Sequence, residues 1–380
     1  MTSSTRLPQA RRHFLLIGLG MTLAVAGCQT RRAPSPGPGF PEPAKPVEGP
    51  RNMVAVIVPT SGADGAIGLS IANAAHLALA DSGDNSLRLT VYDSAAAGGA
   101  AAAATRAIAD GNRLILGPLL AQDVRAAAPV ARRADVPIVA FSNDEKVAGN
   151  GVYIMGFTPD QSIARIVSHV RTTGRGSFAA LVPTGLYGQR ASQAMLAAVR
   201  KFGGRITVVE QYNRSPASVK AAATRLRGKG NFDAVLIGDA GRMAAVAAPA
   251  LPPRAKFMGT ELWASDKTLG KTPALRGAWF AAAPDARFNQ LTGRYRARFG
   301  KSPYRLASLG YDAVLLAVRS ARHWPVGKPF PARSLIDKGG FSGVDGAFRF
   351  GRDGIAERLL EVRQVTAAGT TIVSPAGKAF

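Results

Sequence analysis

The chain has 380 residues, of which 48 are Lys or Arg, 24 are Asp or Glu and one is cysteine. A single cysteine excludes a disulfide framework and a cysteine-based zinc cluster. The net charge of +24 favours anionic partners, and the length beyond the N-terminal leader suffices for two domains of about 150 residues each.

Residues 1–27 predict a signal peptide. Arg6, Arg11 and Arg12 form a basic start without any acidic residue, and an apolar run follows over 14–26. This run is shorter than the roughly 20 apolar residues of a membrane-spanning helix. The stretch "ARRHFLL" resembles a twin-arginine export signal, but a general secretory leader explains the two adjacent arginines equally well.

Cys28 is expected to carry a lipid. The stretch "VAGC" that ends at this residue resembles the lipobox of bacterial lipoproteins, in which the cysteine is acylated and becomes the mature N-terminus. Several acyl chains anchor a protein durably, whereas one chain holds only marginally. In that family, Gln29 beside the cysteine implies an outer-membrane lipoprotein facing the periplasm. The alternative is that Cys28 is an ordinary small residue of the signal core.

Residues 28–51 are expected to form the lipidated N-terminus and a linker. The part from residue 30 holds seven of the 25 prolines and almost no large apolar side chain, so it cannot form a core. Such a composition predicts a semi-rigid polyproline tether.

From residue 52 onward, apolar runs of strand length alternate with helical patterns. The expected strands are 53–59, 87–93, 113–117 and 136–141 in a first series, and 177–183, 205–212, 232–238 and 255–259 in a second. The expected helices between them are 66–81, 99–110, 121–134, 162–173, 187–202, 218–227 and 241–250. This alternation predicts an α/β protein with two parallel sheets covered on both faces.

Six segments in order resemble the periplasmic-binding-protein family of the leucine/isoleucine/valine type. They are "VAVIVPTSGADGAIG", "LTVYDSAAAGGAAAAATRAI", "LILGPLLAQDVRAAAPVARRADVPIVAFSND", "YGQRA", "YDAVLLAV" and "FSGVDGAFRFGRDG". The resemblance implies the two-lobed type I fold, with a hinge and a cleft between the lobes. It assigns 52–156 plus 284–324 to lobe 1, and 157–283 plus 325–380 to lobe 2.

The resemblance and the strand ends together give candidate residues for a ligand cleft, because ligands of such sheets bind beyond the carboxyl ends of the strands. The candidates are Ser61, Gly62, Leu120, Ala121, Gln122, Ser142, Asn143, Tyr187, Asp239 and Trp263. Asp239 would face a ligand ammonium group. The alternative is that Ser61, Ser142 and Asp239 are helix N-caps and that Trp263 packs in the core or hinge.

No catalytic motif stands in the sequence. His13 leaves with the signal peptide, and His76, His169 and His323 lack a second histidine at metal-ligand spacing. There is no Gly-x-Ser-x-Gly elbow and no phosphate-binding glycine loop. We therefore expect no catalytic residues, no metal and no cofactor, and a protein that is not an enzyme.

Two functions fit these observations. In the amino-acid binders of the family, the loop after the third strand supplies hydroxyl groups, whereas "GPLLAQD" here has no serine. The chain in this respect resembles the penicillin-binding protein activators, outer-membrane lipoproteins that regulate peptidoglycan synthases, and this regulator function is preferred. The alternative is a substrate-binding lipoprotein that delivers amino acids or amides to an ABC permease. A polar, convergent cleft would favour transport.

Removing residues 1–27 lowers the net charge from +24 to +21, because it removes three arginines. The partners this charge favours are lipopolysaccharide, peptidoglycan carboxylates or an acidic synthase surface. The stretch "RYRARF" interleaves basic and aromatic residues as nucleic-acid grooves do, but export makes a nucleic-acid partner unexpected.

Overall fold

The computed structural model describes residues 49–378 and 380, and the chain from Pro50 forms one compact unit. The predicted signal peptide, the lipidation site Cys28 and the linker as far as residue 48 lie outside the described residues. Within the described part, no helix is both long and apolar enough to span a bilayer.

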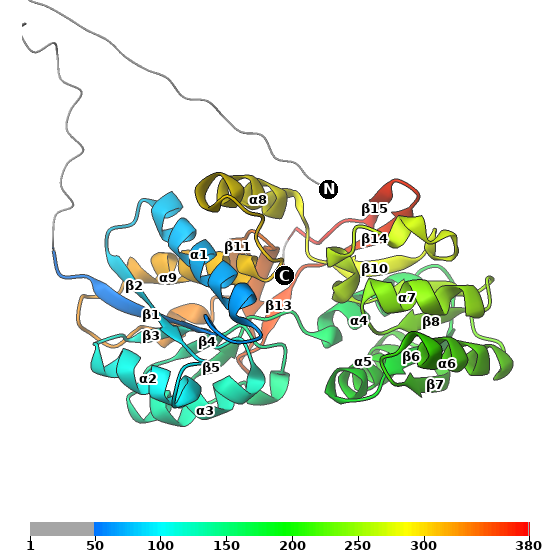
Figure 1. Cartoon of the computed structure of the whole chain (residues 1–380), viewed down its shortest axis with the longest axis horizontal. Helices are drawn as coiled ribbons and strands as arrows, with labels where there is room; N and C mark the ends of the chain where they lie inside the picture. The colour runs from blue at the N-terminus through cyan, green and yellow to red at the C-terminus, as the bar shows by residue number, and fades with distance from the viewer. Residues whose placement is uncertain (1–48, 379) are drawn as a thin grey trace, which may run out of the picture. The chain divides into compact units, whose positions relative to one another are not determined.

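The first lobe contains a five-stranded parallel sheet in the order β2-β1-β3-β4-β5 (Figure 1). Its strands are β1 (Asn52–Val58), β2 (Leu87–Asp93), β3 (Leu114–Leu116), β4 (Ile138–Ala140) and β5 (Val152–Ile154). The helices are α1 (Gly65–Ser82), α8 (Ala286–Phe299) and α9 (Ala307–Ala321) on one face, and α2 (Gly99–Ala109) and α3 (Ala121–Arg133) on the other. Val56 faces the first group and Ile57 the second, which explains why β1 is apolar at every position.

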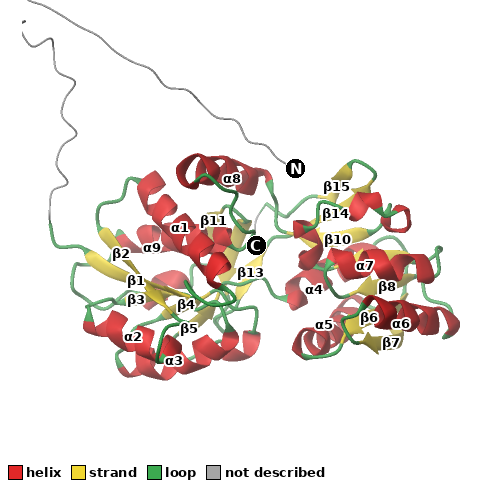
Figure 2. Cartoon of the chain, in the orientation of Figure 1, coloured by secondary structure: helices red, strands yellow, loops and turns green. Residues whose placement is uncertain are grey.

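The second lobe contains a seven-stranded sheet in the order β15-β14-β10-β9-β8-β6-β7, covered by helices on both faces (Figure 2). Its strands are β6 (Ser177–Pro183), β7 (Arg205–Tyr212), β8 (Ala234–Ile237), β9 (Lys256–Gly259), β10 (Trp279–Ala282), β14 (Glu361–Thr366) and β15 (Gly369–Ser374). Its helices are α4 (Pro159–Arg171), α5 (Leu186–Phe202), α6 (Pro216–Gly228) and α7 (Gly241–Ala247). The pairs β10–β14 and β14–β15 are antiparallel, and the other pairs are parallel. The two lobes confirm the predicted type I fold. The expectation of two parallel sheets holds for the first lobe, whereas the second sheet is mixed because β14 returns antiparallel to β10.

A small three-stranded sheet packs against the first lobe. It consists of β11 (Phe341–Gly343), β12 (Gly346–Phe350) and β13 (Ala356–Arg358). Phe341 and Phe348 lie in the same hydrophobic cluster as α1 and α9. This packing corrects the expected assignment of 325–380 as a whole to lobe 2: the segment through β13 belongs with lobe 1, and only β14 and β15 pair in the second sheet.

Six short 3-10 turns complete the described chain. They are η1 (Glu145–Val147), η2 (Ala248–Ala250), η3 (Glu261–Ser265), η4 (Leu269–Lys271), η5 (Pro273–Leu275) and η6 (Ala332–Leu335).

The chain crosses between the lobes three times, at 155–158, 283–285 and 359–360, and two buried arginines link these crossings. Arg358 donates to the carbonyl oxygen of Met155 (2.5 Å), which joins the first and third crossings. Arg363 donates to the carbonyl oxygen of Ala283 (3.2 Å) and pairs with Asp285, which joins the second and third. The crossings therefore form one hydrogen-bonded hinge.

In each lobe, the helix that follows the first strand begins against the end of that strand through a glycine. A Cβ on Gly68 would lie 1.7 Å from the carbonyl oxygen of Pro59, and a Cβ on Gly188 would lie 1.6 Å from that of Pro183. Only glycine allows this close approach. It places the starts of α1 and α5 directly over the carboxyl ends of β1 and β6.

Candidate functional site

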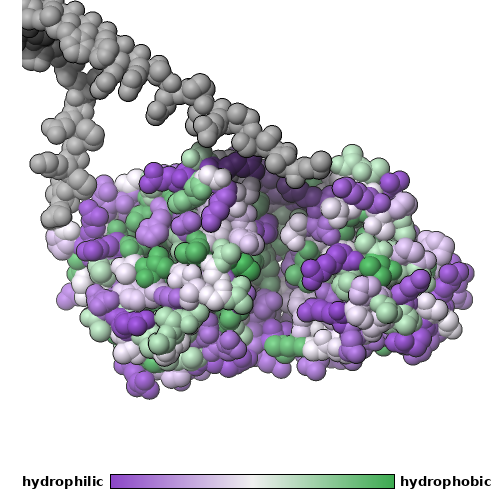
Figure 3. All heavy atoms as spheres, viewed as in Figure 1, coloured by the Kyte–Doolittle hydropathy of each residue, from purple (hydrophilic) through white to green (hydrophobic). Residues whose placement is uncertain are grey.

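A cavity of about 450 Å³ lies between the lobes, at the carboxyl ends of the strands. Figure 3 shows the surface hollowed between the two lobes. The lining residues are mostly apolar, with five polar or charged exceptions: Asp64, Asn143, Glu261, Ser265 and Arg305. A cavity of this size and composition is typical of a small-molecule site.

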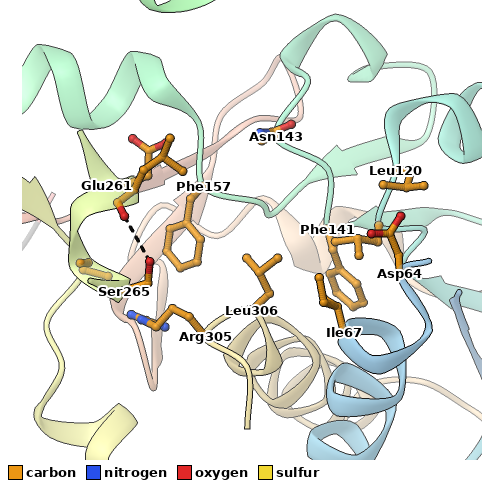
Figure 4. A pocket seen from close by; sticks show the side chains of 14 residues that line it. Asp64, Ile67, Leu120, Phe141, Asn143, Phe157, Glu261, Ser265, Arg305 and Leu306 are labelled. Carbon is orange, nitrogen blue, oxygen red and sulfur yellow. Dashed lines mark hydrogen bonds between the residues drawn. The ribbon is translucent and has the colours of Figure 1, made fainter. Parts of the chain in front are cut away.

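The first lobe supplies the apolar wall. Ile67 comes from the first turn of α1, Leu119 and Leu120 from the loop after β3, and Phe141 from the end of β4. Figure 4 shows Ile67, Leu120 and Phe141 on one side, opposite Glu261 and Ser265 from the second lobe. The absence of hydroxyl groups noted in "GPLLAQD" thus gives this wall its apolar character.

Glu261 is the acidic group of the second lobe's wall. It stands two residues beyond β9, where it accepts hydrogen bonds from the Ser162 hydroxyl and from the Tyr187 hydroxyl (3.1 Å). The Tyr187 hydroxyl also lies 3.0 Å from Thr260 Oγ1. Burial raises the pKa of Glu261, and the charge of Asp160 raises it further. A cationic ligand group would offset this cost of keeping Glu261 ionised.

Arg305 is the only cationic side chain that lines this cavity, and it lies just before α9. Its Nη1 is 2.6 Å from Oδ1 of Asp345, whose side chain is fully buried, and donates to the Ser308 hydroxyl (2.9 Å). Its guanidinium lies 4.2 Å from the ring centre of Phe288 and 5.4 Å from that of Phe157. These contacts fix the guanidinium, which has five donors and so retains some for a ligand.

Arg305 is paired with a buried charge cluster formed by Asp345, Asp312 and Arg358. Asp312 accepts from the backbone N–H groups of Val344 (2.6 Å) and Asp345 (3.3 Å). Burial and the neighbouring charge of Asp345 raise the pKa of Asp312 to about 7. Burial lowers the pKa of Arg358, while the charges of Asp345 and Asp312 act in the opposite direction. The same buried carboxylates, Asp312 and Asp345, thus lie close to Arg305 at the cavity and to Arg358 at the hinge.

Two of the predicted cleft residues, Leu120 and Asn143, line the cavity. Tyr187 contributes through its hydrogen bond to Glu261 rather than as a lining residue. Ala121 and Gln122 follow Leu120 at the start of α3 and are not among the lining residues.

The remaining predicted cleft residues lie elsewhere. Ser61 and Gly62 are exposed and do not line the cavity, and the Ser61 hydroxyl donates to Asp93 (2.6 Å). Ser142 is buried and accepts from the backbone N–H of Asp144 (3.1 Å).

Asp239 and Trp263 are buried against each other rather than turned toward a ligand. Asp239 accepts from the Tyr212 hydroxyl (2.8 Å) and from Arg214 Nε (3.1 Å). Trp263 is fully buried, and its Nε1 donates to the carbonyl oxygen of Asp239 (3.0 Å). Trp263 therefore packs in the core, as its alternative interpretation predicted. The alternative that Ser61, Ser142 and Asp239 are helix N-caps is wrong. The N-caps of the elements that follow them, α1, η1 and α7, are Asp64, Asp144 and Ala240.

Sequence reasoning missed Glu261 and Arg305. A signal for Glu261 was present, because it closely follows the apolar strand "KFMG" and thus the carboxyl edge of the sheet. No local signal marks Arg305, which precedes a helix and reaches the cavity only through tertiary packing.

An ion pair joins the lobes beside the cavity. Arg190 of α5 lies 2.6 Å from Asp144, and its Nη1 donates to the carbonyl oxygen of Asn143 (3.4 Å). Asp144 also pairs with Arg125 of α3, in its own lobe (2.5 Å). The Asp144 side chain is fully buried, so its carboxylate depends on these two cations.

The described residues contain no group of three or more His, Cys, Asp or Glu side chains that could hold a metal ion. His169 instead packs on Trp279, with ring centres 4.9 Å apart, and burial is the main cause of its lowered pKa.

Comparison with known families identifies this architecture. The family model described as periplasmic binding protein matches residues 53–370. The chain belongs to the periplasmic-binding-protein family. Membership places it among periplasmic ligand-binding proteins, and the resemblance to the leucine-binding type is confirmed.

Solved structures agree on the fold. A putative branched-chain amino acid ABC transporter protein from Rhodospirillum rubrum is 19% identical, with a TM-score of 0.75 over 85% of this chain and 100% of that one. An ABC transporter substrate-binding protein from Desulfitobacterium hafniense, solved with Leu, is 19% identical, with a TM-score of 0.66 over the same shares. At these identities the likeness establishes the fold alone.

A curated relative, the uncharacterized protein RP748 of Rickettsia prowazekii, is 24% identical over 173 residues. The match spans 46% of this chain and 46% of that relative.

Proposed function

We propose that this protein binds a small zwitterionic ligand with an apolar side chain, such as an aliphatic amino acid, and presents it to an ABC permease. The observation that carries the proposal is the composition of the cavity. An apolar wall stands on the first lobe, with a carboxylate, Glu261, on the second lobe and a guanidinium, Arg305, beside α9. The complex of the Desulfitobacterium hafniense protein with Leu is consistent with this ligand class.

Glu261 and Arg305 would bind the ammonium and the carboxylate of the ligand, respectively. Two hydroxyl groups orient Glu261, and burial disfavours its ionised form, so a ligand ammonium would stabilise it. The ligand carboxylate would accept from Arg305, in place of the hydroxyl groups that the loop after β3 lacks. The side chain would lie against Ile67 and Leu120.

Binding would favour the closed arrangement of the lobes, because the ligand contacts both walls only when they are close. The three-segment hinge is suited to this motion. A protein that works by this cycle needs no catalytic residue, in line with the expectation that it is not an enzyme.

The outer-membrane anchor at Cys28 remains part of the proposal, on the sequence evidence alone. Regulation of a peptidoglycan synthase, the function preferred from the "GPLLAQD" loop, has less support than transport. Substrate-binding proteins of transporters are among the similar solved structures, and the cavity has convergent charges that a purely protein-binding regulator does not require.

Isothermal titration of the protein with leucine, isoleucine and valine tests this function. Isoamylamine, which lacks the carboxylate, and 4-methylpentanoate, which lacks the ammonium, should bind at least tenfold more weakly. E261Q should weaken leucine binding by about 10- to 100-fold, since a hydrogen bond to a charged group contributes about 1.5–3 kcal/mol.

The matched control is D64N, which makes the same charge change on the opposite wall. A larger loss in D64N than in E261Q would contradict the assignment of the ammonium. Absence of binding by every amino acid, with capture of a peptidoglycan synthase instead, would overturn the transport function.

A further inference from the structure

A second pocket, of about 190 Å³, lies at the opposite edge of the second lobe's sheet from the ligand cavity. Lys256 is the first residue of β9 and Arg276 stands three residues before β10, so the pocket marks the amino-terminal edge of these parallel strands. Glu261 lies beyond the carboxyl end of β9. A ligand in this pocket would therefore not compete for the cleft.

The pocket is lined by four cationic side chains and by no acidic one: Arg175, Arg254, Lys256 and Arg276. Throughout residues 49–378 and 380, none of the four forms an ion pair within 4.0 Å. Four positive charges around one hollow repel each other, and an anion would relieve this repulsion.

Neutral groups hold these cations in place. Lys256 Nζ donates to the carbonyl oxygen of Gly277 (3.0 Å) and lies 4.0 Å from the ring centre of Trp279. Burial, followed by the charge of Arg175, lowers the pKa of Lys256. A bound anion would act in the opposite direction and raise the pKa of this lysine.

The two exposed arginines keep free donors. Arg276 uses its Nε on the carbonyl oxygen of Gly270 (3.1 Å), and Arg254 uses one Nη on the side chain of Asn231. The remaining guanidinium N–H groups can form the forked contacts that suit phosphate oxygens. Asp233, whose carbonyl oxygen accepts from Lys256, turns its carboxylate to the backbone N–H groups of Gly176 and Ser177 and does not line the pocket.

We propose that this pocket is a phosphate-binding site, which takes a phosphate group either free or as part of a lipid headgroup. Three guanidinium groups and one ammonium supply the charge and directional donors that a phosphate dianion or a phosphodiester requires. The site is independent of the amino-acid ligand, and it gives the second lobe a basic edge remote from the cleft.

The test uses the full chain and two double variants of equal charge. R254Q/R276Q removes the two exposed arginines of the pocket, whereas R200Q/R227Q removes two exposed arginines of the same lobe outside it. Thermal unfolding is followed during titration with sodium phosphate at constant ionic strength, with chloride as the balancing ion. Sedimentation then measures binding to vesicles of phosphatidylglycerol and of phosphatidylcholine alone.

A saturable rise of the melting temperature with phosphate is expected in the wild type and in R200Q/R227Q, with at least tenfold weaker apparent affinity in R254Q/R276Q. Loss of phosphatidylglycerol binding only in R254Q/R276Q, without a response to free phosphate, would support the site and assign a lipid headgroup. An equal response of both double variants, or no phosphate or vesicle response beyond that of chloride or phosphatidylcholine, would overturn the proposal.

Discussion

The ion pair between Arg190 and Asp144 is expected to favour the closed arrangement of the lobes. Arg190 keeps only 12% of its side chain exposed and Asp144 none, so the pair is stronger than a surface salt bridge of about 1 kcal/mol or less. Asp144 keeps Arg125 when Arg190 is replaced, so the loss is smaller than the 3–5 kcal/mol typical of a broken buried pair. We expect R190M to cost about 1.5–2 kcal/mol, a 10- to 30-fold shift toward the open form.

Distance measurement between two spin labels tests this. Cys28 is the only cysteine, so C28S allows one label on each lobe, at the exposed positions 132 and 200. R190M should broaden the distance distribution toward longer values. The control R125M removes a cation from the same carboxylate but within one lobe, so its distribution should match that of the wild type. An unchanged distribution in R190M, or an equal change in R125M, would refute the reasoning.

Three further predictions concern stability. G188A should lower the free energy of unfolding in guanidinium by about 3 kcal/mol, because the new Cβ would meet the carbonyl oxygen of Pro183. The control G293A, which has open space in α8, should be neutral or slightly stabilising. Equal effects of the two variants would contradict the close approach. R363M should lower the free energy of unfolding by about 3–5 kcal/mol, because Glu361 is 5% exposed and loses its cation. The double variant E361Q/R363M should recover part of this loss in the same assay. No recovery would count against the pairing. Burial and the charge of Asp345 raise the pKa of Asp312 to about 7. The folded state therefore keeps a proton that the unfolded chain releases from about pH 4 upward. The free energy of unfolding consequently falls as pH rises toward 7. D312N should show a shallower loss in urea midpoints between pH 4.5 and 7.5, and an equal slope would be the contrary result.

The longer elements could be predicted from local pattern alone. The strand expected over 53–59 occupies Asn52–Val58, and the helix expected over 187–202 occupies Leu186–Phe202. Two short strands were not predicted: β5 has three residues, Val152–Ile154, and β10 has four, Trp279–Ala282. Length alone is not the reason, because β3 also has three residues and was expected over 113–117. β3 stands between two predicted helices and so continues the alternation, whereas β5 and β10 do not stand at such positions.

The candidate site was predictable only in part, for a similar reason. Strand ends indicate an edge of the sheet, which led to Leu120 and Asn143, but they do not indicate which way a side chain turns. Asp239 and Trp263 stand at suitable chain positions and yet bond to each other in the core. In "RYRARF", Tyr295 is buried and Phe299 packs on the same cluster, so the aromatic residues face the core while the arginines face solvent.

The threefold crossing also determines when the first lobe can be completed during synthesis. The hydroxyl of Tyr311 in α9 donates to Asp81 in α1 across 230 positions, and Asn52 donates to the carbonyl oxygen of Trp324 across 272. At about 5–20 residues per second, α1 waits roughly 10–50 s for the helix that covers it. During that interval the nascent chain exposes an apolar helix face and an unfinished core. If the chain takes the twin-arginine route, which exports folded proteins, it is expected to depend on a holding chaperone during this interval. Substitutions that speed aggregation at β1 or α1 should then reduce its yield without altering the finished fold.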